Sequence, residues 1–200
     1  MNFSRSKIMK IAIMAEGGAL LIALVLAKYL DIEIFPLTKE PFRDLLIGTA
    51  AAVPPFLLFL FSVSEKAEKV PLIGSLRRIV LKDIRSVFSG CTFIDLLIIS
   101  LLAGLGEEFL FRGTMQTKLG IIAASIIFGL FHAVSPAYVI AATIMGFYIG
   151  AFYHMSGGLL VPVQIHFVYD LAALVYIRYF ITDSLEQSYG PGVMGEGKNI

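Results

Sequence analysis

Three short groups of ionisable residues interrupt a chain that is otherwise mostly apolar. They are GEEFLFR at 106–112, FGLFH at 128–132 and HFVYD at 166–170. Carboxylates and imidazoles are the side chains that most often take up and release protons in hydrolysis. These residue types indicate general acid–base catalysis, in which one group activates water and others position it and stabilise an oxyanion.

The first group contains two adjacent glutamates, to which helical spacing gives different neighbours. Glu108 and Arg112 are four residues apart, so they lie on one helix face and predict an ion pair. Glu107 points about 100° away from Glu108 and has no counter-charge beside it in its own segment. We therefore expect Arg112 to position Glu108, and Glu107 to face a cavity. The alternative is a helix end that emerges into water, where all three side chains are solvated.

The second and third groups contain two of the three histidines of the chain. His132 ends an apolar segment, which by itself is more typical of a hydrogen-bonded interfacial histidine than of a catalyst. His166 and Asp170 are four residues apart. We expect Asp170 to accept a hydrogen bond from one imidazole nitrogen and to fix the tautomer that presents the other. The alternative is a structural His–Asp pair that joins two helices.

The composition indicates that these groups lie in a membrane. Of the 200 residues, 58% are hydrophobic and 16% are charged, and the mean hydropathy is +0.84. Soluble domains carry about 25% charged residues. The net charge of +1 excludes the strong basicity expected of a nucleic-acid binder. The single cysteine, Cys91, excludes an intrachain disulfide framework and a cysteine-rich metal site.

Apolar stretches of about the length of a bilayer crossing predict an all-α fold, a polytopic transmembrane helical bundle of about six spans. An ionisable group inside a span costs at least ~2.5–3.5 kcal/mol on insertion scales, so the three groups are expected to converge on one polar cavity. We expect a single integral membrane domain over 1–183 and a flexible polar tail over 184–200. The predicted spans are 9–30, 44–63, 92–111, 119–134, 137–155 and 159–180.

Basic residues near the N-terminus and in 64–90 predict the orientation. Arg5, Lys7 and Lys10 precede the first span, and 64–90 combines six Lys and Arg residues with apolar residues at helical spacing. The positive-inside rule places both regions in the cytoplasm, and we expect a multi-pass protein of the cell membrane. Segment 64–90 is predicted to be a basic amphipathic helix at an anionic leaflet, or alternatively a solvated loop.

The three groups together resemble the motifs of the CPBP family, the CAAX proteases and bacteriocin-processing proteins that are also called the Abi family. EEFLFR at 107–112 matches E-E-x-x-x-R, FGLFH matches F-x-x-x-H, and HFVYD matches H-x-x-x-N/D, within a family-like core of 95–180. The resemblance implies an intramembrane endopeptidase, and eukaryotic members of this family remove the last three residues of prenylated CAAX proteins. The implied partners are the bilayer and a membrane-associated peptide or protein substrate, lipidated or not.

The resemblance also implies roles for individual residues. Glu107 would be the general base that activates water, and His132 would share that water. Glu108 and Arg112 would form the supporting pair that the helical spacing predicts independently. Two rival classes stay open from the residues alone. One is a proton-coupled transporter that uses these groups as a relay, and the other is a non-catalytic bacteriocin-immunity or scaffold protein.

The comparison with the family leaves two alternatives each for the oxyanion site and for a metal. His166 and Asp170 would line the oxyanion site, but CAAX-processing members commonly carry asparagine where this chain has Asp170. An ionised aspartate cannot donate to an oxyanion. Either Asp170 is protonated or it orients His166, which then donates, and we favour the second. Zinc held by Glu107, His132 and His166 is an alternative, but because H-E-x-x-H is absent we favour a mechanism without a cofactor.

The expected orientation conflicts with the resemblance. The active site of CAAX proteases opens to the cytoplasm, where the prenylated tails are. Counting spans from a cytoplasmic N-terminus places the Glu107 end of the third span on the opposite side. An additional or re-entrant span at 71–88 would reverse this placement.

Overall fold

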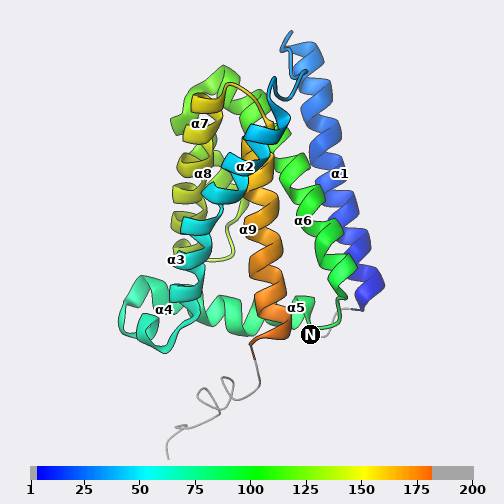
Figure 1. The fold of residues 1–200 in the computed structure, drawn as a ribbon. Coiled ribbons are helices and arrows are strands. Elements are labelled where there is room, and N and C mark those ends of the chain that lie inside the picture. Colours follow the sequence, from blue (N-terminus) through cyan, green and yellow to red (C-terminus); the bar gives the residue numbers. More distant parts are fainter. Residues whose placement is uncertain (1–3, 182–200) are drawn as a thin grey trace, which may run out of the picture.

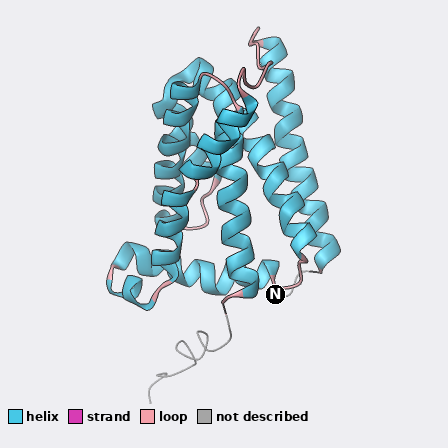
Figure 2. Ribbon diagram, viewed as in Figure 1, coloured by secondary structure: helices cyan, strands magenta, loops and turns pink. Residues whose placement is uncertain are grey.

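The computed structural model describes residues 4–181, and every regular element in that range is a helix (Figure 2). The predicted all-α transmembrane bundle is therefore confirmed as the fold class. The tail predicted at 184–200 lies outside the described residues. Most of the helices run along the long axis of the bundle, and α4 (Pro71–Arg78) and α5 (Arg85–Phe88) lie across one end of it (Figure 1).

The first long helix, α1 (Arg5–Tyr29), packs against α6 (Phe93–Glu108). The starts of the two helices are joined by an ion pair, in which the guanidinium of Arg5 contacts the carboxylate of Asp95 at 2.6 and 2.9 Å. Asp95 also forms a capping box with Thr92, which satisfies backbone N–H groups at the start of α6. Much of the remaining surface of α1 is apolar and exposed, as expected for a helix that faces lipid.

The chain returns through α2 (Pro41–Ala51) and α3 (Val53–Val63). The break between them comes directly before Pro54 and Pro55, whose missing N–H groups fit the first turn of a helix. A 3₁₀ turn at Glu65–Lys69 then leads into α4, a π-helical segment at Ile79–Ile84, and α5. We call residues 65–88 the foot of the bundle. The foot lies at the same end of the bundle as the start of α1 (Figure 1).

The foot is helical, as the spacing within 64–90 predicts, but one of its basic residues does not lie on an outer face. Arg77 is only 1% exposed. Its Nε donates to the carbonyl oxygen of Val63 at 3.2 Å, and its Nη1 lies 3.6 Å from the carboxylate of Glu68. The residue therefore joins the foot to the end of α3, and the basic outer face is smaller than predicted.

The second half of the chain contains all three predicted groups. After α6, a π-helical segment, η3 (Phe109–Gln116), leads into α7 (Thr117–Phe131). The helical run bends at Gly120, which has a φ of +81° that L side chains rarely adopt. The last two helices, α8 (Pro136–Ser156) and α9 (Leu160–Tyr179), pack against α7 and against α6, respectively.

Four helical segments of the described residues are long and apolar enough to cross a membrane: α1, α2 with α3, α8 and α9. Pro71–Phe88 and Phe93–Phe131 meet at a bend of 114° and together make up to a fifth. The predicted count of about six is roughly compatible with this arrangement. The two short predicted spans at 92–111 and 119–134 differ from expectation, because they lie in one helical run that bends and is not interrupted by a loop.

Candidate active site

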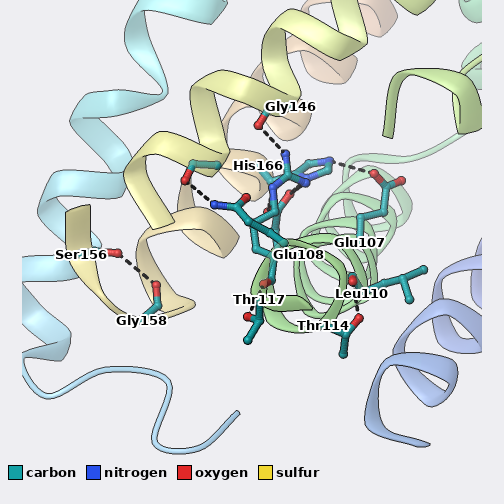
Figure 3. A network of polar contacts seen from close by, with 12 residues as sticks. Glu107, Glu108, Leu110, Thr114, Thr117, Gly146, Ser156, Gly158 and His166 are labelled. Atoms are coloured by element: carbon teal, nitrogen blue, oxygen red, sulfur yellow. Dashed lines mark hydrogen bonds and ion pairs between the residues drawn. The ribbon is translucent and has the colours of Figure 1, made fainter. Parts of the chain in front are cut away.

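The ion pair predicted from helical spacing is present at the junction of α6 and η3. Arg112 donates from Nη1 to Oε1 of Glu108 at 3.1 Å, and its Nε lies 3.1 Å from Oε2. Both side chains are at most 2% exposed. Arg112 also donates to the carbonyl oxygen of Gly146 on α8 at 3.2 Å (Figure 3). Its guanidinium lies 4.6 Å from the centre of the Phe128 ring. The pair is thus buried and joined to two neighbouring helices.

The third motif meets this pair from α9, but through a contact that differs from the predicted one. Nδ1 of His166 lies 2.6 Å from Oε1 of Glu108, and a carboxylate can only accept. Asp170, the expected partner, lies 3.4 Å from the other ring nitrogen, Nε2. Glu108 on a neighbouring helix, and not Asp170 one turn further along α9, therefore makes the closer contact that orients the imidazole. Spacing along the chain identifies neighbours within a helix only, which is why the sequence favours Asp170.

His132 lies at the C-terminal end of α7 and faces the same region. Its Nδ1 lies 2.8 Å from the carbonyl oxygen of Phe128, so this nitrogen carries a proton and donates. In a neutral ring, Nε2 is then an acceptor. That atom lies 3.6 Å from Oε2 of Glu107, which is too far for a direct hydrogen bond.

The side chains of His132 and His166 both face Glu107. Its Oε2 is buried and makes no hydrogen bond with any residue of 4–181. The same oxygen lies 3.9 Å from Nε2 of His166, and Figure 3 shows the carboxylate and the imidazole directed toward each other. A buried carboxylate oxygen without a partner is costly unless a ligand or water uses it. Two imidazole nitrogens and one free carboxylate oxygen therefore surround a position where water could be bound and deprotonated.

A fourth acid, Glu16 on α1, was not predicted to belong to the site. It interacts electrostatically with Glu107, His166 and Asp170. Its backbone lies against Gly106, where an added Cβ would come within 2.5 Å of the Glu16 carbonyl oxygen, so only glycine allows this approach of α1 to α6. The signal in the sequence is that Glu16 is the sole acid of the first predicted span, 9–30.

Three of the motif residues, Glu107, His132 and His166, are the alternative zinc ligands. Among residues 4–181, no group of three His, Cys, Asp or Glu side chains is found in an arrangement that could hold a metal ion. Zinc at these residues stays an alternative to the mechanism without a cofactor, which we favour.

The fold and the site define a class, an integral multi-pass membrane protein with a buried carboxylate–imidazole centre. Residues 89–172 match the family model described as type II CAAX prenyl endopeptidase Rce1-like. That segment contains all six ionisable residues of the three motifs. The family resemblance predicted from the motifs is therefore confirmed for this part of the chain.

One curated relative also matches the chain. The uncharacterized protein YpbD of Bacillus subtilis (strain 168) is 33% identical over 98 residues, which are 48% of this chain and 52% of YpbD. The chain thus spans about half the length of the curated relative it matches. No solved structure matches.

Proposed function

We propose that this protein is an endopeptidase that hydrolyses a peptide bond within or at the surface of the membrane, with Glu107 as the general base. The observation that carries the proposal is the unpaired, buried Oε2 of Glu107, which lies 3.6 and 3.9 Å from the Nε2 atoms of His132 and His166. The match of residues 89–172 to a CAAX endopeptidase family supports the reaction class. The substrate is a membrane-associated peptide or protein, and we propose the cell membrane as the location.

The reaction uses one water and two proton transfers. Water donates one hydrogen bond to Oε2 of Glu107 and the other to Nε2 of His132, which is an acceptor because Nδ1 holds the proton. As the water oxygen attacks the carbonyl carbon of the substrate, Glu107 takes the water proton and the carbonyl oxygen becomes an oxyanion. The C–N bond then breaks, Glu107 returns its proton to the leaving amine, and the products are a carboxylic acid and an amine.

The remaining motif residues hold this arrangement in place. Arg112 holds Glu108 in place through the ion pair, and Glu108 in turn orients His166. His166 presents Nε2 between Glu107 and Asp170, the position that the family resemblance assigns to the oxyanion site. Asp170 contributes by facing that nitrogen, since an ionised carboxylate cannot itself donate to an oxyanion.

The test is peptide cleavage by the purified protein in proteoliposomes, measured by mass spectrometry on a panel of membrane peptides with and without a prenylated CAAX end. Wild type is expected to cleave a member of the panel and Glu107→Ala is expected not to. The matched control is Tyr148→Phe, because the Tyr148 hydroxyl donates to the carbonyl oxygen of Ala51 away from the motif residues. Equal cleavage by Glu107→Ala contradicts the proposal. Proton flux that depends on Glu107, without cleavage, would favour the transporter.

Metal removal gives a separate test of the mechanism. Cleavage is expected to survive dialysis against a strong zinc chelator, with less than one zinc per protein before and after treatment. Stoichiometric zinc whose removal abolishes cleavage, and whose return restores it, would contradict a mechanism that relies on Glu107, His132 and water alone.

A further inference from the structure

The proposed hydrolysis places a negative charge on the substrate carbonyl oxygen, and this oxyanion needs hydrogen-bond donors. Most N–H donors near Glu107 are already engaged. The guanidinium of Arg112 serves Glu108 and the carbonyl oxygen of Gly146, and its face lies over Phe128. Nδ1 of His132 serves the carbonyl oxygen of Phe128. Neither residue has a donor directed at the reacting carbonyl.

His166 can supply a donor in only one of its forms. Its Nδ1 proton is used on Glu108 at 2.6 Å, so Nε2 carries a proton only when the ring is doubly protonated. Its other neighbours, Asp170 and Glu107, are carboxylates and accept when ionised. The motif residues therefore supply several hydrogen-bond acceptors. They supply no donor to the oxyanion that is present whether or not the His166 ring is doubly protonated.

Tyr138, on the first turn of α8, has a hydroxyl that is available for a hydrogen bond as far as the described residues show. It makes no side-chain hydrogen bond with any other residue of 4–181, whereas its backbone N–H is fixed by the Oγ of Ser135 at 3.2 Å. Its ring lies beside that of His132, with centroids 6.3 Å apart and planes 21° from parallel. The hydroxyl also interacts electrostatically with Glu107 and with Asp170. Tyr138 thus faces the same acceptor-rich region as the motif histidines.

We propose that the hydroxyl of Tyr138 donates a hydrogen bond to the oxyanion, and so supplies the donor that Asp170 cannot. This inference rests on the proposed endopeptidase function. A phenol donates at neutral pH without a change of charge, and its position is fixed by two features, the capped start of α8 and the stack on His132. In the proposed mechanism His132 holds the attacking water. The stack of the Tyr138 ring on His132 therefore also sets the distance between that water and the hydroxyl that donates to the oxyanion.

The test is Tyr138→Phe, which removes only the hydroxyl and keeps the ring beside His132. We expect kcat for peptide cleavage to fall by a factor on the order of 10²–10³, the usual effect of removing one oxyanion donor. KM is expected to change far less, because the charge develops only in the transition state. Rates are normalised to folded protein, which is measured by thiol labelling of Cys91, a residue that is 1% exposed.

Two control variants separate this proposal from a structural role and from the neighbouring tyrosine. Tyr148→Phe is expected to keep kcat, because its hydroxyl is engaged with Ala51. Tyr169→Phe is expected to keep kcat as well: Tyr169 also interacts electrostatically with Tyr138 and Asp170, but its ring packs against the apolar cluster that contains Phe59. Loss of kcat in Tyr169→Phe with an active Tyr138→Phe would overturn the assignment.

The outcomes distinguish this inference from the proposed function. If wild type cleaves and Glu107→Gln does not, while Tyr138→Phe keeps kcat, the oxyanion proposal is wrong and the endopeptidase stands. A rise in KM with unchanged kcat assigns the hydroxyl to substrate binding and overturns the proposal in the same way. If wild type cleaves no peptide, both proposals fail together.

Discussion

Glu107 and Glu108 are adjacent in the chain, yet they lie in two regions of the site that differ in ion pairing and exposure, although Oε2 of each makes no hydrogen bond within residues 4–181. The Glu108 region is closed: its carboxylate contacts Arg112 and His166, and its side chain has no exposed surface. The Glu107 region is open: one oxygen has no hydrogen-bond partner among the described residues, and the side chain is 15% exposed. A rotation of about 100° between adjacent residues therefore separates a group that holds the fold from a group that is available to a substrate.

This difference predicts that one glutamate controls the activity of the protein and the other its stability. A buried carboxylate that is ion-paired compensates the charge of its partner, and its loss leaves that partner charged and uncompensated. A carboxylate without partners contributes little to stability, because its burial is unfavourable, and its retention points to chemistry. Variants of the two glutamates should therefore separate activity from folding.

The largest expected effect is on activity, from Glu107→Gln. The amide keeps the shape of the side chain but cannot take a proton from water, so the cleavage rate should fall by a factor on the order of 10²–10⁴. Stability should be unchanged or higher, because a neutral amide is easier to bury than a carboxylate. The measurements are cleavage in proteoliposomes and a melting curve in detergent. An early melt with intact specific activity would reverse the roles of the two glutamates.

The next effect is on stability, from Glu108→Gln. The substitution leaves Arg112 charged and buried without its counter-ion, which costs about 3–5 kcal/mol when a pair is fully buried. We expect lower yield and a lower melting temperature, with reduced activity as a consequence. The double variant Glu108→Gln with Arg112→Gln removes both charges and should recover part of the loss. A Glu108→Gln protein that melts like wild type but is inactive would contradict this assignment.

The smallest effect is expected at the far end of α6, from Arg5→Ala. Arg5 is 56% exposed, and its partner Asp95 keeps its hydrogen bonds from Thr92 at 2.8 Å, so the loss should be about 1 kcal/mol or less. For a chain of this size that is a fall of about 2–4 °C in melting temperature, with unchanged activity. Cys91 reports the unfolding, because burial raises the pKa of its thiol and slows labelling in the folded protein. A loss of activity without a change in melting temperature would contradict this expectation and would show that the Arg5–Asp95 ion pair acts on the site.

The features that follow from spacing along one helix could be predicted from the sequence. Periodicity and apolar length predict the helical class, and the four-residue spacing predicts the Glu108–Arg112 pair that the structure contains. The catalytic roles of Glu107, His132, His166 and Asp170 stay predictions. They rest on the motifs and on distances, and the experiments above test them.

The features that depend on how helices are rotated against each other could not be predicted. The closest partner of His166 is Glu108 on another helix, because α9 is rotated so that Nδ1 faces α6. Arg77 is buried because the end of α3 offers it a carbonyl group. Glu16 reaches the site because Gly106 lets α1 approach α6 closely. Each of these contacts joins segments that are distant in sequence or on different helices, so no local pattern encodes it.

The placement of Glu108 and Arg112 four residues apart also bears on how the protein is made. Both charges belong to one helical run and emerge from the ribosome together, whereas Gly146 and His166 are synthesised later. A charge that meets its counter-ion within its own segment enters lipid at a lower cost than one that must wait for a partner on another helix. The charges of Glu108 and Arg112 are therefore compensated before α8 and α9 are synthesised, and these helices then assemble on a segment that already contains the pair.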